Sequence, residues 1–418
     1  MTRSIFPIFM LCILAMSYLP VLGQNRNEIA TQKVIHTRID SVLNEAVHTQ
    51  KIPGAVILVA KRGQVFMHKA YGYRKLFNSQ GTATLNKPPK LSTGHLFDVA
   101  SLTKTFTTTG ILLLVDRGQI KLDDAVAKYL PSFNRPDKKE ITVRQLLTHS
   151  SGLLAWYPLY YKANNKKEVY ELVASLPLDY TPGTKRKYSD LGFAILGQII
   201  EVVSKKPLEV FMSQEVFIPL GMKNTGYTPL KSLPGRTYAA SSLGNPYEYR
   251  MVRDSSLGFT RPEVDPNSWN QWRKYNLEGE VNDGNAWYAC KGVSGAAGIF
   301  STAEDLFKLA NFWLRNGQFH SLSIANKELI KVFTAKDEFN NGLGWMMDPG
   351  NSFMKNAPAG AFGHTGFTGT SITILPGKEL VVILLINRQQ TGLLQNGEYF
   401  NVNAIRKLIF ESVISLVQ

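Results

Sequence analysis

The alternation of apolar and polar positions near the start of the chain predicts a helix followed by a hairpin. Residues 28–49 carry apolar side chains at helical spacing, and Pro53-Gly54 ends this pattern. Residues 55–60 and 65–73 are strand-like apolar runs on either side of a short turn. The chain therefore begins with one helix and two strands that can pair.

The middle of the chain is helical in pattern, and its last third returns to strands. Four helical patterns, separated by Gly and Pro-Gly, predict an α-helical lobe and cover residues 101–117, 142–148, 167–175 and 190–204. A helix, two strands and a helix follow in that order, at 302–316, 369–375, 379–386 and 402–417. Two early and two late strands indicate one antiparallel sheet built from both chain ends. We expect an α/β fold of the α+β sandwich kind, with helices flanking the sheet and an inserted all-α lobe.

The first 23 residues have the pattern of a secretory signal peptide. Arg3 supplies a positive start, residues 5–22 are mostly apolar, and small residues surround a cleavage point near Gly23. We expect the mature protein to begin near Gln24 and to be periplasmic or secreted. An uncleaved anchor is the alternative, since the run approaches the roughly 20 apolar residues that span a bilayer, but two prolines interrupt it.

Charge and cysteine content narrow the possible partners. The net charge is +15, but Lys and Arg are scattered along the chain, which favours a solvated surface over a nucleic-acid site. Cys12 lies in the signal segment, so Cys290 is the single cysteine expected in the mature chain. We expect no cofactor, no metal, no nucleic-acid partner and no stable membrane anchor after signal cleavage.

The candidate nucleophile is Ser101, in the tetrad Ser101-Leu102-Thr103-Lys104. It begins the first long helix of the lobe, where the helix dipole and free backbone N–H groups help to hold an oxyanion. Lys104 lies one turn later on the same helix face. A second Ser-x-x-Lys at 352–355 lies in a segment rich in Gly, Asn and Pro, and we interpret it as chance. The elbow-like segment 292–296 ends in Ala where Gly belongs, so we interpret it as a tight turn.

Three further motifs stand downstream of Ser101. They are Leu146-Leu147-Thr148-His149-Ser150-Ser151-Gly152-Leu153, Pro182-Gly183-Thr184-Lys185-Arg186-Lys187-Tyr188-Ser189-Asp190 and Gly363-His364-Thr365-Gly366. In order and spacing, the four motifs together resemble the serine β-lactamase-related superfamily. The closest branch holds class C β-lactamases, D-alanyl-D-alanine carboxypeptidases, D-aminopeptidases and esterases. The resemblance covers residues from about 30 to 390 and implies a β-lactamase/transpeptidase-like fold and a serine hydrolase that uses a covalent acyl-enzyme.

The resemblance also implies roles for individual residues. Ser101 attacks the carbonyl carbon, Lys104 and Tyr188 share the proton transfer, and His149 shapes the helical lobe. The residues implied to contact the substrate or its oxyanion are His364, Thr365, Gly366, Phe367 and Asp190, with the backbone N–H groups of Ser101 and Phe367 as the oxyanion hole. Free Lys and Tyr both have pKa values near 10, so the sequence leaves open which of the two is the resting base.

Two departures from the family pattern bear on the substrate. Asp190 stands where β-lactamases carry Asn, and a carboxylate in contact with Lys104 is expected to hold that lysine charged. His364 stands where many relatives carry Lys, which replaces a permanent charge by a group expected to titrate near neutrality. Both departures weaken the case for efficient β-lactam hydrolysis and favour a peptidase, amidase or esterase.

The segment of about 228–291 is long, poor in helical pattern and rich in Trp, Tyr and Arg, including Trp269, Trp272 and Trp287. It is either a specificity element for an anionic or amphiphilic substrate, small molecule or peptide, or a surface insertion with its own small core.

The expected organisation is a signal peptide and one catalytic domain, 24–418, which contains a sheet lobe, a helical lobe and a variable insertion. These parts cover about 24–100 with 292–418, about 101–227, and about 228–291. Three functions are compatible with it: a secreted hydrolase of amide, peptide or ester bonds; an acyltransferase that uses the same acyl-enzyme; and a binding or sensor protein without turnover. The intact Ser101, Lys104 and Tyr188 argue against the third.

Overall fold

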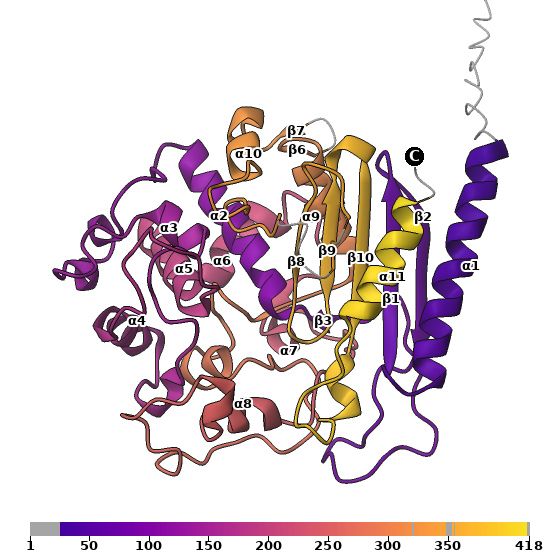
Figure 1. Cartoon of the computed structure of the whole chain (residues 1–418), viewed down its shortest axis with the longest axis horizontal. Helices are drawn as coiled ribbons and strands as arrows, with labels where there is room; N and C mark the ends of the chain where they lie inside the picture. Colours follow the sequence, from indigo (N-terminus) through magenta and orange to yellow (C-terminus); the bar gives the residue numbers. More distant parts are fainter. Residues whose placement is uncertain (1–25, 320–321, 348–352, 355, 416–418) are drawn as a thin grey trace, which may run out of the picture.

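A five-stranded antiparallel sheet built from both ends of the chain forms one half of the protein (Figure 1). The computed structural model describes residues 26–319, 322–347, 353–354 and 356–415. The strand order is β2-β1-β10-β9-β8. Their bounds are β1 Gly54–Lys61, β2 Gln64–Gly72, β8 Phe362–Thr365, β9 Ser371–Leu375 and β10 Leu380–Ile386. The pairing of β1 with β10 joins the two chain ends at the centre of the sheet, which confirms the expected architecture.

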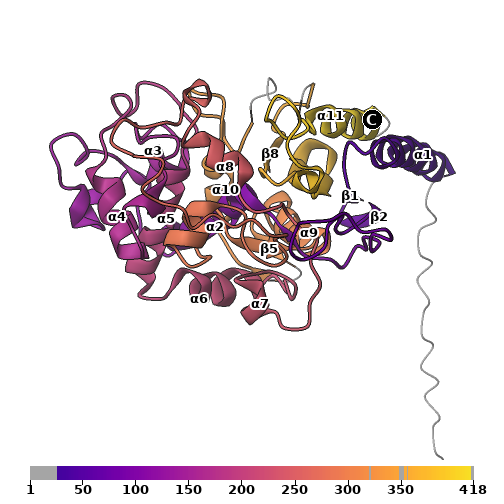
Figure 2. The ribbon, with the colours of Figure 1, turned by 90° about the horizontal axis from the view of Figure 1, so that it is seen from below.

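The two central strands are buried on both faces, which explains their uninterrupted apolar sequences. Successive side chains of a strand point to opposite faces. Ile57 and Val59 of β1 therefore pack on one side, with helices α1 (Arg26–His48) and α11 (Asn403–Ile414). Val56 and Leu58 pack on the other side, where α9 (Ala303–Leu314) contacts the sheet. Figure 2 shows α1 and α11 side by side on their face of the sheet.

The other half of the protein is helical and centres on α2 (Thr103–Asp116). Every residue of α2 from Thr103 to Leu114 is buried, because α5 and α6 pack against it. The remaining helices of this half are α3 Val143–Leu147, α4 Lys166–Ser175, α5 Asp190–Ser204 and α6 Leu208–Met212. Short helices α7 Pro229–Ser232, α8 Pro246–Met251 and α10 Lys327–Phe333 lie farther along the chain.

Short strands that the hydrophobic pattern does not reveal complete the fold. A three-stranded sheet, β3-β5-β4, is formed by Phe97–Asp98, Ile299–Ser301 and Gly226–Tyr227. A two-stranded sheet pairs β6 Gln318–Phe319 with β7 Leu322–Ser323. Strand β8 is a further addition, because the Gly-His-Thr segment, expected to stand before a strand, is itself the edge strand. Segments of two to four residues are too short for a period of two to stand out.

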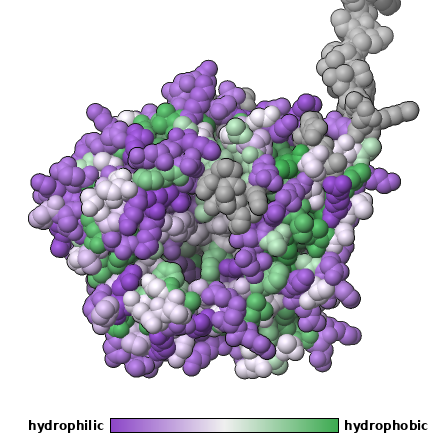
Figure 3. Space-filling view, viewed as in Figure 1, coloured by the Kyte–Doolittle hydropathy of each residue, from purple (hydrophilic) through white to green (hydrophobic). Residues whose placement is uncertain are grey.

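Several sequence predictions concern residues that the structure does not describe. The signal segment 1–23, with Cys12, is not among the described residues, nor are Ser352 and Lys355. The lobe boundaries stay predictions. Within the described residues, no helix is both long and apolar enough to cross a membrane. The face seen in Figure 3 is mostly hydrophilic, with hydrophobic patches on its right-hand half.

Candidate active site

Ser101 lies in a tight turn that leads directly into helix α2. The preceding residue, Ala100, has φ of 47°, in the left-handed region that residues with a side chain rarely adopt. The Asp98 carboxylate, 2% exposed, fixes this turn by accepting a hydrogen bond from the Ala100 N–H at 2.9 Å. Its second oxygen accepts from the Asn282 N–H at 2.6 Å. Asp98 thus joins the turn of the candidate nucleophile to the far end of the 228–291 segment.

The Lys104 ammonium lies against Ser101 at the start of α2. Lys104 is fully buried, and its Nζ has three acceptors within 3.0 Å. Ser101 Oγ lies at 2.9 Å, the Ala296 carbonyl oxygen at 3.0 Å, and Asp190 Oδ1 at 2.7 Å. An ammonium carries three N–H donors, so these contacts hold Nζ at one position beside the hydroxyl. The expected contact between Lys104 and Asp190 is present.

Lys104 is a cation and Tyr188 a neutral phenol near pH 7. Burial lowers the pKa of Lys104, but the carboxylate of Asp190 and the oxygen of Tyr188 more than offset it, so that pKa lies above its usual value. Burial raises the pKa of Tyr188, and the Lys104 charge offsets this only in part. The Lys104 charge therefore does not make Tyr188 a resting phenolate. Because both groups are protonated at rest, the Lys104–Tyr188 pair must lose one proton before it can accept the proton of Ser101.

Replacing Asp190 by Asn is expected to shift the pH dependence of turnover. Asp190→Asn removes the carboxylate that raises the pKa of Lys104, while burial still lowers it, so the pKa falls. More Lys104 is then neutral at a given pH, and the rising limb of kcat against pH moves to lower pH by about one unit or more. A pH–rate series on both proteins measures this shift. An unchanged limb would mean that Lys104 ionisation does not control the rate.

His149 positions Tyr188 by hydrogen bonds to the residues just before and just after it in the chain. The backbone N–H of Lys187 donates to the His149 carbonyl at 3.0 Å, and the N–H of Ser189 donates to His149 Nδ1 at 3.1 Å. The His149 ring lies 4.4 Å from the Tyr188 ring, centroid to centroid. Burial lowers the pKa of His149, and an Nδ1 that accepts a hydrogen bond fits a neutral ring. His149 is therefore a positioning residue, which fixes the place of the Tyr188 side chain.

His364 lies behind Tyr188 and does not titrate near neutrality, which corrects the expectation from sequence. Its ring is 6.1 Å from that of Tyr188, and the residue is 1% exposed. Burial, followed by the charge of Lys104, lowers the pKa of His364 to about 3. Its Nδ1 bonds to the Thr365 carbonyl oxygen at 2.8 Å, so Nδ1 carries the proton of the neutral ring. His364 offers no charge to an anionic substrate at pH 7.

The loop after β8 brings Phe367 to the nucleophile turn. A side chain on Gly366 would lie 2.4 Å from the Val99 carbonyl oxygen, so glycine is needed for this close approach. The Thr368 and Thr370 hydroxyls donate to the Asp98 and Val99 carbonyls at 2.7 and 3.0 Å. These bonds fix the loop to the residues just before Ser101, which is what an oxyanion hole from two backbone N–H groups requires.

Two arginines hold the same loop from the other side. Arg388 Nε donates to the Phe367 carbonyl at 2.9 Å. Arg406, on α11, donates to the Thr370 carbonyl at 2.7 Å and more loosely to the Gly366 carbonyl at 3.4 Å. Burial lowers the pKa of Arg406 to about 9, so it stays a cation at neutral pH. Sequence reasoning missed both arginines.

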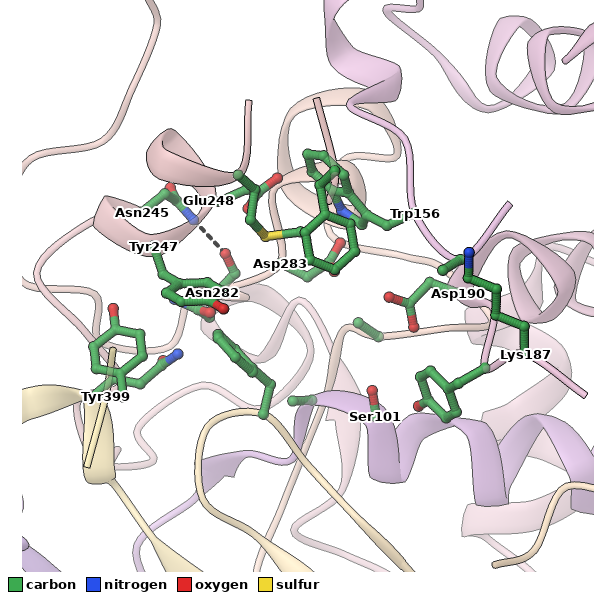
Figure 4. Close-up of a pocket in the computed structure, with 18 residues that line it drawn as sticks. Ser101, Trp156, Lys187, Asp190, Asn245, Tyr247, Glu248, Asn282, Asp283 and Tyr399 are labelled. Atoms are coloured by element: carbon green, nitrogen blue, oxygen red, sulfur yellow. Dashed lines mark hydrogen bonds between the residues drawn. The ribbon is translucent and has the colours of Figure 1, made fainter. Parts of the chain in front are cut away.

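A cavity of about 450 Å³ opens beside Ser101. Figure 4 shows the Ser101 hydroxyl at its floor, Asp190 on one side, and Tyr247 and Tyr399 across from them. Of the predicted site residues, the structure places Ser101, Tyr188, Asp190 and Phe367 in the cavity lining. Lys104, His364, Thr365 and Gly366 lie outside that lining.

The 228–291 segment lines this cavity and also packs aromatic side chains against the main core. The lining residues that it contributes are Asn245, Tyr247, Glu248, Met251, Phe259, Asn282 and Asp283. Trp269 and Trp272 are not in the cavity lining and pack with Tyr160 and Tyr288, with ring centroids 4.6 to 6.4 Å apart. Both interpretations of the segment stay predictions, because lining the cavity does not test specificity and Trp269 and Trp272 pack against the main core.

The cavity wall is more acidic than the composition of the segment suggested. It contains Asp190, Glu248 and Asp283, and a single basic residue, Lys187. Burial, followed by the charge of Asp190, raises the pKa of Asp283 to about 6, and burial raises the pKa of Glu248 to about 8. The arginines of the segment bond elsewhere, for example Arg250 to Asp254 at 2.7 Å. The expectation of an anionic substrate stays a prediction, with Lys187 as the basic residue of this wall.

Two further residues of the candidate active site were not predicted from the sequence, and both present a backbone or side-chain amide group. The Ala296 carbonyl, which accepts from Lys104, lies in the segment interpreted as a tight turn. Gln389 lies in the cavity wall and belongs to no recognised motif. Within the described residues, no group of three or more His, Cys, Asp or Glu side chains is placed to hold a metal ion.

Fold and candidate site together agree with a serine hydrolase. The chain belongs to the beta-lactamase family, whose model matches residues 39–404. Membership confirms the resemblance drawn from the motifs, and relatives named as amidase and carboxypeptidase establish the chain as an enzyme of this family.

Two curated relatives and one solved structure illustrate the similarity. An "N-acetylmuramyl-L-alanine amidase" of Bacillus subtilis is 33% identical, over 91% of this chain and 87% of its own. A "Putative D-alanyl-D-alanine carboxypeptidase" of Escherichia coli is 32% identical, over 90% and 88%. A class C β-lactamase from Rhodobacter sphaeroides has the same fold, with a TM-score of 0.63 at 18% identity, over 91% of this chain and 100% of its own.

Proposed function

We propose that this protein is an exported amidase that hydrolyses an amide bond of N-acetylmuramyl peptides through an acyl-enzyme on Ser101. One observation carries the catalytic part: the buried Lys104 ammonium touches both Ser101 Oγ and Asp190, at 2.9 and 2.7 Å, beside an open cavity. The names of the two curated relatives both denote amide bonds, which supports the bond class. The signal pattern of residues 1–23 supports export.

The proposed reaction has two balanced steps. Ser101 Oγ bonds to the amide carbonyl carbon, and its proton passes through Lys104 and Tyr188 to the leaving nitrogen as the C–N bond breaks. The backbone N–H groups of Ser101 and Phe367 stabilise the oxyanion of each tetrahedral intermediate. Water then attacks the ester carbon, releases a carboxylic acid and returns a proton to Ser101.

The bond that is cleaved can be read from product masses. Purified mature protein is incubated with N-acetylmuramyl-L-alanyl-D-glutamate and, separately, with a peptide ending in D-alanyl-D-alanine. We expect the first to give N-acetylmuramic acid and a free dipeptide. Release of D-alanine from the second, without cleavage of the first, would replace the amidase proposal by a carboxypeptidase.

A pair of chromogenic substrates tests the interpretation of Asp190 and His364. We expect p-nitrophenyl ester hydrolysis to exceed cephalosporin hydrolysis, because a carboxylate and a neutral histidine replace the residues that β-lactamases carry. Faster turnover of the cephalosporin would contradict that interpretation.

A further inference from the structure

Gln389 is a buried residue in the wall of the active-site cavity. It belongs to the 3₁₀ turn Arg388–Thr391 that follows β10, and it is 1% exposed. The Gln389 carbonyl accepts from the Gly392 N–H at 3.0 Å, and the preceding Arg388 is bonded to the Phe367 carbonyl. The backbone that carries the Gln389 side chain is therefore tied to the loop beside the nucleophile.

The side-chain amide of Gln389 has no protein partner among the described residues, at either its nitrogen or its oxygen. Buried polar groups are nearly always paired, and an unpaired one reduces stability. The next residue shows the usual arrangement. Gln390, 0% exposed, donates to Asn276 Oδ1 at 2.6 Å and accepts from the Leu76 N–H at 3.1 Å. One glutamine bonds within the protein, and its neighbour in the cavity wall does not.

Aromatic rings lie in the same wall. Tyr247, Phe367 and Tyr399 form a cluster, with ring centroids 5.4 to 6.0 Å apart, and all three line the cavity. Flat apolar faces next to one donor and one acceptor are complementary to a secondary amide with apolar neighbours.

We infer that Gln389 is a specificity-determining residue that pairs with a secondary amide of the substrate. Its Nε2 donates to the carbonyl oxygen of this amide, whose N–H points away on the opposite edge because the amide is trans. The inference rests on the proposed function and deepens it, since it names the substrate group that the cavity recognises. An N-acetyl group on a sugar and an acylated amino acid both supply this amide.

The test compares Gln389→Met with wild type on substrates with and without an amide. We expect kcat/KM for N-acetylmuramyl-L-alanyl-D-glutamate to fall about 10- to 100-fold. Methionine cannot donate the hydrogen bond that the substrate amide receives from Gln389. The kcat/KM for p-nitrophenyl acetate, which has no amide, stays within about 2-fold. The Tm rises by about 1 to 2 °C, since an unpaired buried amide is removed. Gln395→Met, at an exposed glutamine outside the cavity, is the matched control and changes none of these.

Two inhibitors distinguish the sources of the amide. N-acetylmuramic acid carries it on a sugar and N-acetyl-D-alanine on an amino acid, and each is measured for inhibition of ester hydrolysis and for its shift of Tm. Gln389→Met weakens the inhibitor that carries the recognised amide. Equal losses on both substrates, a lower Tm, or unchanged binding of both inhibitors would overturn the inference. If wild type cleaves neither substrate, the proposed function fails, and the Tm shifts still decide the role of Gln389.

Discussion

Ser101→Ala is expected to lower kcat by about 10⁴-fold or more on every substrate that the wild type turns over. The nucleophile forms the covalent bond on which the reaction depends, and without it only binding and oxyanion stabilisation remain. A loss of this size corresponds to about 5.5 kcal/mol of transition-state stabilisation. Steady-state rates at saturating ester and amide substrate measure it.

Stability serves as the control for this variant. Lys104 keeps its bonds to Ala296 and Asp190 when the hydroxyl is removed, so the free energy of unfolding is expected to change by less than about 1 kcal/mol. A folded Ser101→Ala protein that retains most of its activity would show that another residue is the nucleophile.

Lys104→Met is expected to reduce both activity and stability. The substitution removes the group that bonds to Ser101 Oγ, and a loss of kcat of about 10³-fold follows from lost proton transfer. It also leaves Asp190, 29% exposed, without its cation. Removal of one partner of such an ion pair costs about 3 kcal/mol, which denaturant unfolding can measure.

A second substitution separates the two effects of Lys104. In Lys104→Met/Asp190→Asn no unpaired carboxylate remains, so part of the lost stability is expected to return while kcat stays low. Recovery of activity together with stability would mean that Lys104 is structural and takes no part in proton transfer.

Much of the fold could be predicted because the helices and strands that build its two halves are long and periodic. Helix α5, predicted at 190–204, is observed at Asp190–Ser204, and the apolar run predicted at 379–386 is β10 at Leu380–Ile386. Burial on one stripe of a helix or on both faces of a strand leaves a clear pattern in the sequence. Strand β8 leaves none, because its four residues lie at the sheet edge and its Gly-His-Thr segment also forms the motif.

The identity of the site's side chains could be predicted more fully than their burial and their hydrogen-bond partners. Ser101, Lys104, Tyr188 and Asp190 stand in motifs with fixed spacing, and the structure brings them together. The burial of a single polar side chain leaves no pattern in the sequence, so the low pKa of His364 could not be foreseen. The Ala296 carbonyl and the Gln389 amide could not be foreseen either, since their roles depend on which distant segment meets them in space.

The most direct test of the account is the mass and position of a covalent adduct. Mature protein is treated with a fluorophosphonate and with an activated ester, and its intact mass and peptide map are compared with those of Ser101→Ala. The account predicts one adduct per chain, on Ser101, and none on the variant. An adduct on Ser294 or Ser352, or an equal adduct on the variant, would contradict it.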